Sequence, residues 1–278
     1  VKEGDRETLE RLKRLIDPFV LRRVKKDVLK ELPDKVEQVV YSHLEGEQRT
    51  LYAAKALELK KELESGGCAD GGGKLQILSG LMRLRQICCD PRLCLKDYRA
   101  GSAKLETCVD LIRRGVEGEH KILVFSQFAS MLELIGERLE KEKIACYKLT
   151  GAVSKEERLR LVSLFSKDTV PVFLISLKAG GTGLNLTAAD IVIHYDPWWN
   201  VAAQNQATDR AHRIGQEKQV TVYRLITQNT VEENILKLQE TKRELADQVV
   251  TGEGISLAKL TKEDLLGCIG EMSGDGIG

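Results

Sequence analysis

Long apolar segments are absent from this sequence. No hydrophobic run approaches the ~20 residues that a helix needs to cross a lipid bilayer, and the charged N-terminus lacks the apolar core of a secretory signal. These absences exclude membrane-spanning helices and favour an intracellular protein, in the cytoplasm or nucleoid of a bacterium or in a eukaryotic nucleus. The first residue is Val1 rather than methionine, so we expect a processed chain or a fragment of a longer protein.

An excess of either charge is absent too, and so is a metal-ligand pattern. The sequence has 43 Lys and Arg residues against 42 Asp and Glu, a net charge of +1, which leaves nucleic-acid binding to local patches. Seven cysteines include one loose cluster, from Cys88 to Cys108, whose spacing fits no paired C-x-x-C zinc motif and has no histidine nearby. We therefore expect reduced thiols and no metal site.

Three stretches are expected along the chain: a helical region over 1–100, a core over 101–229, and a long helix with a tail over 230–278. In the first, residues 47–63 are rich in helix formers. A glycine-rich loop is predicted at 65–73, followed by a second helix that ends at a proline. The only strand expected in this stretch is a short one, Val36–Tyr41.

The middle stretch alternates strand-length apolar runs with amphipathic helices. The runs are Lys121–Ser126, Ala145–Leu149, Val170–Ser176, Ile191–Tyr195 and Val220–Ile226. Such alternation predicts an α/β fold with a mainly parallel sheet and helices on both faces. The final helix, from Thr230, carries an apolar stripe that favours packing on the sheet or the helical region over a separate coiled coil.

The most specific pattern is the run from Gln206 to Gln216, which we call the arginine segment. Arg210 and Arg213 stand three apart, so on a helix both guanidinium groups would leave the same face. A guanidinium is permanently charged and forks onto phosphate oxygens, which suits it to neutralise charge on a transferred γ-phosphate. Two surface arginines on a solvated helix are the alternative interpretation.

A second run, Ser176 to Asp190, directly follows a predicted buried strand, and we call it the glycine segment. It lies at the carboxyl end of that strand, where open α/β sheets bind ligands. Gly180, Gly181 and Gly183 let backbone amides approach a phosphate, and a helix start would add its positive end. The alternative is a tight turn that needs glycine only for its geometry.

Three shorter segments also follow predicted strands. The polar residues of 124–128 suit either contacts to a phosphate backbone or a polar strand-end cap. The segment 149–151 ends in Thr-Gly. The segment 196–200 contains two adjacent tryptophans, which by themselves favour core packing over an interface.

Together these segments resemble the ordered motifs of the helicase-like ATPases of superfamily two, in the SWI/SNF-type form. The arginine segment, with its Ile-Gly-Gln ending, resembles the last motif, the glycine segment the fifth, and 124–128 the fourth. Residues 17–33 and 84–93 resemble the helical protrusion of these enzymes. The resemblance covers about residues 15–250, and bacterial members are nearest in style. It implies a RecA-like lobe, the C-terminal one of two, preceded by the protrusion and followed by a bracing helix.

The resemblance also implies roles for single residues. Arg210 and Arg213 would act as catalytic arginine fingers, with Gly181, Gln206 and Asp209 beside the nucleotide. The implied DNA contacts are Ser126, Gln127, Thr150, Gly151, Lys178, Ala179, Gly180, Thr182, Asn185, Trp198 and Trp199. A basic cluster, Arg22 to Lys26, is by default a solvated face and alternatively a contact to DNA or the other lobe. The expected partners are duplex DNA and an N-terminal RecA-like lobe, and the chain is expected to be monomeric.

The sequence lacks the phosphate-binding loop G-x-x-x-x-G-K-[ST] and the acidic Mg²⁺ motif that such an ATPase needs. The run 68–75 imitates the loop, but Leu75 stands where the hydroxyl is required. ATP and Mg²⁺ are therefore expected only together with the missing lobe, and the isolated chain is expected not to hydrolyse ATP. The alternatives are a non-catalytic DNA- or protein-binding module derived from such a lobe and a strand-separating helicase of a neighbouring family.

Overall fold

The computed structural model describes residues 32–64, 71–180 and 183–248, together with residues 11, 15 and 267. Gly181 and Thr182 of the glycine segment, the basic cluster Arg22–Lys26 and the tail after residue 252, apart from residue 267, lie outside the described residues.

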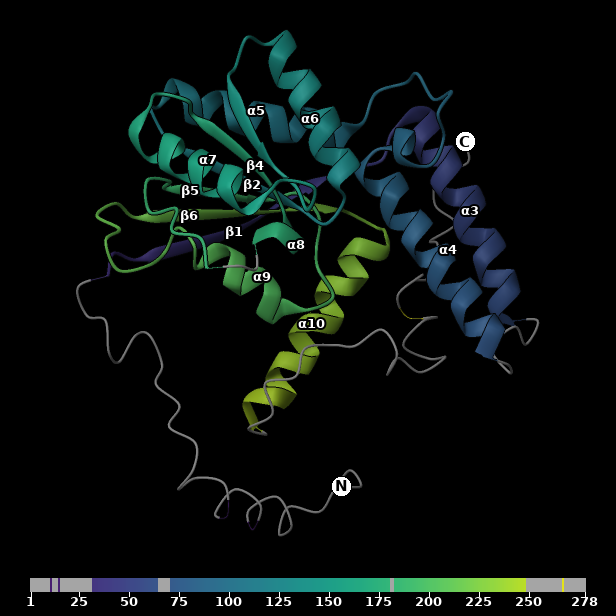
Figure 1. Ribbon diagram of the computed structural model, residues 1–278. Coiled ribbons are helices and arrows are strands. Elements are labelled where there is room, and N and C mark those ends of the chain that lie inside the picture. The colour runs from purple at the N-terminus through teal and green to yellow at the C-terminus, as the bar shows by residue number, and fades with distance from the viewer. Residues whose placement is uncertain are drawn as a thin grey trace.

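Six parallel strands form one sheet in the order β1-β6-β5-β2-β4-β3 (Figure 1). The strands are β1 (Lys35–Ser42), β2 (Ile122–Ser126), β3 (Cys146–Leu149), β4 (Val172–Ser176), β5 (Ile191–His194) and β6 (Val220–Thr227). Every residue of β2, β4 and β5 is buried, as in strands covered on both faces. The predicted α/β fold with a parallel sheet is confirmed, and each predicted strand run contains a strand.

The first strand of the sheet comes from the first stretch of the chain. β1 pairs along its whole length with β6, from Lys35 beside Val220 to Ser42 beside Thr227. The short predicted strand is thus an edge of the main sheet, although the helical pair separates it from the other strands in sequence. The expected division at residue 100 therefore does not separate the strands of the sheet from the helical region, because β1 lies before it in sequence.

The described helices are α3 (Gly46–Glu64), α4 (Gly71–Cys89), α5 (Ala103–Glu117), α6 (Ala129–Lys141), α7 (Lys155–Lys167), α8 (Leu177–Gly180), α9 (Val201–Thr208) and α10 (Val231–Gln248), with the 3-10 helix η1 (Pro91–Leu93). α4 begins inside the loop predicted for 65–73. The loop prediction is wrong for residues 71–73, because the first turn of a helix leaves its N–H groups outside the hydrogen-bond ladder and tolerates glycine there.

Helices cover both faces of the sheet. α5 and α6 pack on one face through residues such as Ile112 and Leu132. On the other face, α7, α8 and α9 pack through residues such as Phe165 and Ala207. Ser154 is the N-cap of α7, and its hydroxyl accepts a hydrogen bond from the Glu157 amide at 3.2 Å.

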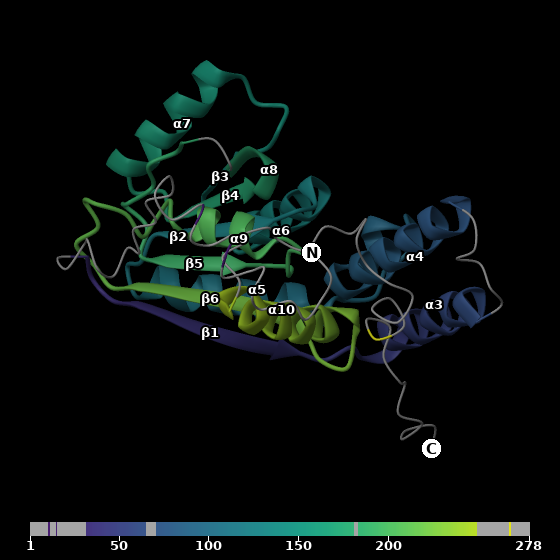
Figure 2. The ribbon, with the colours of Figure 1, turned by 90° about the horizontal axis from the view of Figure 1, so that it is seen from below.

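α3 and α4 lie side by side next to the sheet (Figures 1 and 2), and we call this pair of helices the protrusion. A third core joins them to α10, with Leu84 and Ile235 among its members. α10 also contacts β6. The prediction that the last helix packs back on the sheet and the helical region is confirmed, for the part of α10 whose side chains are described.

Candidate functional site

The two arginines of the arginine segment do not lie on a helix. α9 ends at Thr208, Asp209 is its C-cap, and the chain continues through turns that carry half-buried Arg210 and exposed Arg213. This corrects the expectation of a shared helix face. The ladder stops here because the amides turn to nearer carbonyls, as Arg210 N does to Ala207 O at 3.2 Å.

Hydrogen bonds hold the arginine segment against the glycine segment. The amide of Leu186 donates to the carbonyl of Arg210 at 3.0 Å. The Gln216 side-chain amide donates to the carbonyls of Thr187 and Ala189 at 3.1 and 2.8 Å. The bonded residues lie 24 to 29 positions apart in sequence, and the two segments thus form one unit. His212 Nε2 also lies 2.8 Å from the carbonyl of Pro33, just before β1.

The glycine segment differs from its predicted form. A four-residue helix, α8, starts immediately after β4 and ends at Gly180, before the other glycines. The described part that follows, 183–190, contains no helix, so the helix start in this segment lies before the glycines. Gly183 has φ +48°, a left-handed conformation that disfavours other residues, and this supports the turn interpretation of the segment's geometry.

The remaining predicted residues differ in exposure. Gly151, Lys178, Asn185 and Gln206 are exposed, Gln127, Thr150, Trp198 and Asp209 are half-buried, and Ala179 is buried. The loop that carries Gly151 follows β3, and the glycine segment follows β4, the neighbouring strand. Parallel strands end at the same edge of a sheet, so these two segments leave from one edge.

Ser126 ends β2 and is completely buried. Its hydroxyl donates to the Asp196 carboxylate at 2.6 Å, and the amide of Gln127 donates to the same oxygen at 3.2 Å. The ends of β2 and β5 are therefore tied together by Asp196. This supports the strand-end cap interpretation and corrects the expectation that the Ser126 hydroxyl faces DNA.

Arg85 of α4 completes this arrangement from the protrusion. Its guanidinium lies 3.4 Å from Asp196, 3.1 Å from Gln127 Oε1, and donates to the Pro197 carbonyl. The side chains of Arg85 and Asp196 are both 0% exposed. Burial raises the pKa of Asp196, and Arg85 and Ser126 act in the opposite direction.

The ring of Trp199 lies against this guanidinium, 5.8 Å from it, and is only 6% exposed. The core interpretation is the one that fits this tryptophan, because the protrusion covers it, which corrects the expectation of a DNA-facing ring. Sequence reasoning missed Arg85. The sequence feature that could have identified it is the position of this charged residue, four residues after Leu81 and so on the apolar face of its helix.

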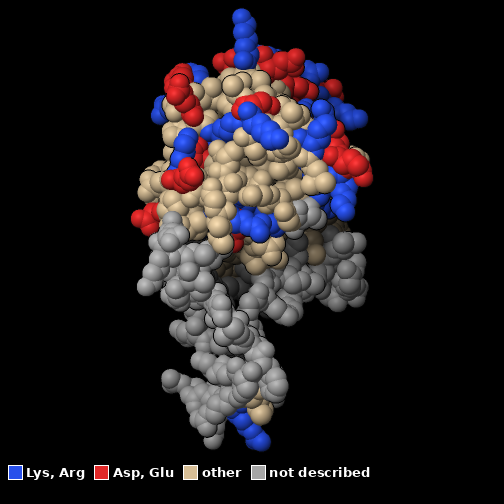
Figure 3. All heavy atoms as spheres, turned by 60° about the vertical axis from the view of Figure 1, so that its left-hand side comes forward, with Lys and Arg blue, Asp and Glu red and all other residues tan. Residues whose placement is uncertain are grey.

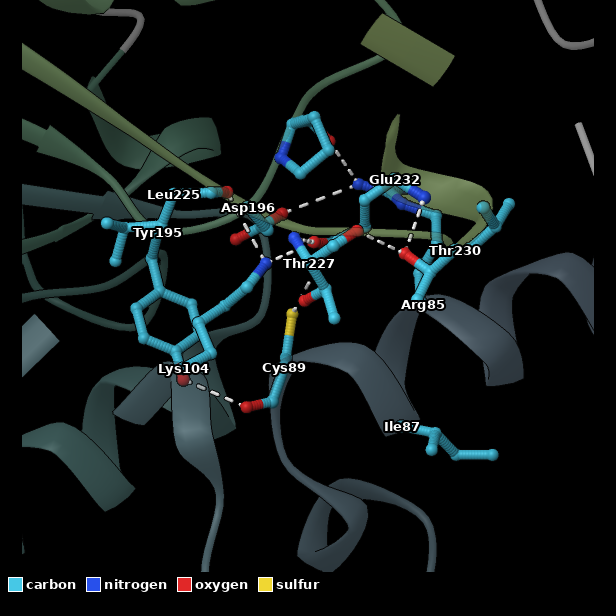
Figure 4. Close-up of polar contacts among 12 residues, drawn as sticks. Arg85, Ile87, Cys89, Lys104, Tyr195, Asp196, Leu225, Thr227, Thr230 and Glu232 are labelled. Carbon is cyan, nitrogen blue, oxygen red and sulfur yellow. Dashed lines mark hydrogen bonds and ion pairs between the residues drawn. The ribbon is translucent and has the colours of Figure 1, made fainter. Parts of the chain in front are cut away.

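A second buried ion pair ties α5 to α10 (Figure 4). Lys104 Nζ pairs with the Glu232 carboxylate and lies 3.4 Å from the carbonyl of Leu225. Glu232 also accepts the Thr227 amide at 2.9 Å. Burial lowers the pKa of Lys104, but the Glu232 carboxylate and the sulfurs of Cys89 and Cys88 together outweigh this, and the pKa is raised. The pair fixes where α10 leaves the sheet.

His194 ends β5 beneath α9 and is fully buried. Its Nε2 lies 2.8 Å from the Thr208 hydroxyl, and its ring stacks on Phe125. Burial, aided by the positive charge of Arg224, lowers the pKa of His194 to about 3. The imidazole is therefore neutral near pH 7.

We predict that His194 makes the fold acid-sensitive. Its folded-state pKa lies below the unfolded value of about 6.5, so the unfolded chain binds the extra proton as the pH falls. Its contribution is complete above pH ~6.5 and is lost toward pH ~3. Between pH 7 and 5 the wild type should lose about 2 kcal/mol more unfolding free energy than His194→Gln, in urea titrations. Equal losses would contradict this.

Three general observations concern metal ligands, membrane spans and surface charge. Among the described residues, no three His, Cys, Asp or Glu side chains gather as metal ligands would. None of the helices described combines the length and apolar character that a bilayer span requires. On the face shown in Figure 3, basic side chains alternate with acidic ones around a broad uncharged area. Electrostatic attraction for a polyanion must then come from local groups.

Comparison with known proteins identifies the family. The model of the helicase conserved C-terminal domain matches residues 103–215, and that of the SNF2-related domain matches residues 1–93. The putative ATP-dependent helicase/translocase YwqA of Bacillus subtilis is 42% identical over 262 residues, 91% of this chain and 28% of that protein. The chain spans about a quarter of the length of this and two mycoplasma helicases, 25% to 28%.

Two solved structures from Sulfolobus solfataricus are similar. The SWI2/SNF2 ATPase C-terminal domain has a TM-score of 0.69 at 33% identity, over 84% of this chain and 96% of that one. The SWI2/SNF2 ATPase core in complex with dsDNA has a TM-score of 0.72 at 37% identity, over 97% of this chain and 57% of that one. The chain has the parallel RecA-like sheet of these domains, and its glycine and arginine segments are hydrogen-bonded to each other. It belongs to the SWI/SNF-type (SNF2-related) family of ATP-dependent helicases and carries their C-terminal helicase domain.

Proposed function

We propose that this chain is the second motor lobe of an ATP-dependent enzyme that translocates along duplex DNA. One observation carries the proposal: the glycine segment and the arginine segment, separate in sequence, are hydrogen-bonded into one unit through Leu186 and Arg210. A DNA contact at the first would then move the guanidinium groups of the second. The similar Sulfolobus core was solved with dsDNA, which supports DNA as the polymer.

The nucleotide would be held between two lobes. Arg210 and Arg213 present guanidinium donors that fit phosphate oxygens and would stabilise the charge of the transferred phosphoryl group. Gly181, Gln206 and Asp209 would lie beside the nucleotide. The described residues contain no acidic cluster for Mg²⁺, so its ligands would come from the other lobe. Bound there, the ion would neutralise phosphate charge.

DNA would be held mainly through its phosphates, which position a duplex without reading its sequence. The exposed and half-buried candidates for this contact are Gln127, Thr150, Gly151, Lys178, Asn185 and Trp198. The predicted residues Gly180 and Thr182 belong to the glycine segment, as Lys178 and Asn185 do. Closing and opening of the lobes would then step the enzyme along the duplex.

We predict that the isolated chain binds duplex DNA weakly and does not hydrolyse ATP. Half of the nucleotide site and the other lobe's DNA contacts would be missing, and the remaining phosphate contacts release few counterions. Fluorescence anisotropy with a labelled duplex, repeated at rising salt, and a phosphate-release assay check this. Nanomolar binding that salt does not weaken, or turnover by the chain alone, would contradict it.

The coding sequence upstream of Val1 separates this function from the alternative of a binding module. The proposal requires a phosphate-binding loop and an acidic Mg²⁺ motif there or on a partner chain. A full protein with both should hydrolyse ATP faster when duplex DNA is present. Finding neither motif, with binding to a partner intact, would favour the module.

A further inference from the structure

Gln216 is the last residue of the arginine segment, and its side chain is turned inward. It is only 6% exposed. Its Nε2 lies within 3.1 Å of three carbonyl oxygens, those of Thr187, Ala189 and Ala211, and its Oε1 accepts the Lys218 amide at 2.9 Å. The side-chain amide thus uses both its donor and its acceptor.

The residues just before Gln216 point the other way. Arg213 is exposed, and Ile214 is 70% exposed. Gly215 between them and Gln216 has φ +96°, a conformation open to glycine and costly for other residues. The chain thus reverses at Gly215, so that one side chain anchors the loop while the arginine stays outside.

We propose that Gln216 is a positioning residue that holds Arg210 and Arg213 in register with the glycine segment. Its side chain is hydrogen-bonded to the carbonyl of Ala211, which lies between the two arginines in sequence. It is also hydrogen-bonded to the carbonyls of Thr187 and Ala189, which follow the glycines. The arginine segment cannot slide along the glycine segment without breaking these bonds. This inference rests on the proposed function, because it concerns how DNA contact reaches the fingers.

Other side chains of similar size cannot replace this clamp. A glutamate would lose the donor and place a negative charge among three carbonyl oxygens. A methionine fills the same volume but neither donates nor accepts. An arginine has no acceptor for the Lys218 amide.

The test uses the full-length protein with Gln216→Glu and Gln216→Met. We expect kcat for DNA-stimulated ATP hydrolysis to fall about 10- to 100-fold, because small misplacements of a catalytic group are costly. KM for ATP and the DNA concentration for half-maximal stimulation should stay within about twofold, since this loss falls on the transition state. Gln219→Glu, which adds the same charge at an exposed position, should retain wild-type kcat.

The outcomes separate this inference from the proposed function. No DNA-stimulated turnover in the wild type would overturn the proposed function itself. Wild-type turnover that needs Arg213, together with normal kcat in both folded Gln216 variants, would overturn only the inference. A rise in KM without a fall in kcat would overturn it as well. Loss of the folded state in both variants, seen by circular dichroism, would make Gln216 a core residue and also overturn it.

Discussion

Replacing Arg213 with alanine is expected to lower DNA-stimulated ATP turnover of the full-length protein by about 10³-fold or more, the usual effect of an arginine finger. The side chain is exposed on a loop, so its removal leaves no cavity. Nucleotide affinity should change little, because the other lobe would hold most of the nucleotide. Steady-state kinetics and binding of a fluorescent ATP analogue measure the two quantities.

Two further variants sharpen this prediction. Arg213→Lys keeps the charge but not the planar fork, and should recover only a small part of the turnover. Arg113→Ala removes another exposed arginine, which pairs with Asp110 on the surface of α5, and should leave turnover unchanged. Normal turnover in Arg213→Ala would remove this residue from the catalytic role.

Replacing Arg85 with methionine is expected to lower the unfolding free energy of this chain by about 3–5 kcal/mol. The change leaves the Asp196 carboxylate buried without its cationic partner, and the Pro197 carbonyl without its donor. Urea denaturation followed by circular dichroism measures the loss. Arg113→Met, at an ion pair whose side chains are about half exposed, should cost less than about 1 kcal/mol.

The pH dependence of the Arg85→Met variant gives a second signature. Burial already raises the pKa of Asp196, and without Arg85 it should rise further. A carboxyl whose folded pKa lies above its unfolded value gains stability as the pH falls. Relative to the wild type, the variant should therefore recover stability between pH 7 and 5. Adding Asp196→Asn should cost less than the sum of the two single changes; strict additivity would contradict the ion pair.

Local patterns predicted much of this fold because their causes are local. The buried strands β2, β4 and β5 appear as continuous apolar runs, and Ser154 caps its helix through a residue three positions away. The family motifs, too, are continuous in sequence. Pairing between strands distant in sequence is different. β1 forms its ladder with β6, about 185 residues later, and neither strand's sequence indicates which strand it pairs with.

The candidate site shows the same division. The identity of Arg210 and Arg213, their spacing and their chemistry follow from the sequence alone. Whether they share a helix does not, because competing carbonyls in the folded chain end α9 at Thr208. Nor does the sequence distinguish a buried tryptophan from an exposed one: Trp199 is covered by helices whose residues lie more than one hundred positions away.

The sequence by itself determined the α/β class and the family, and it supplied the residues that we propose act on phosphate, since residue type, order and spacing carry these. Only the tertiary structure decided which of those side chains stay exposed and what holds them. Arg85 became the link between the protrusion and the strand ends, and Gln216 the clamp between two motifs. Both are polar groups withdrawn from water, and burial obliges such groups to find partners that only the folded chain brings within reach.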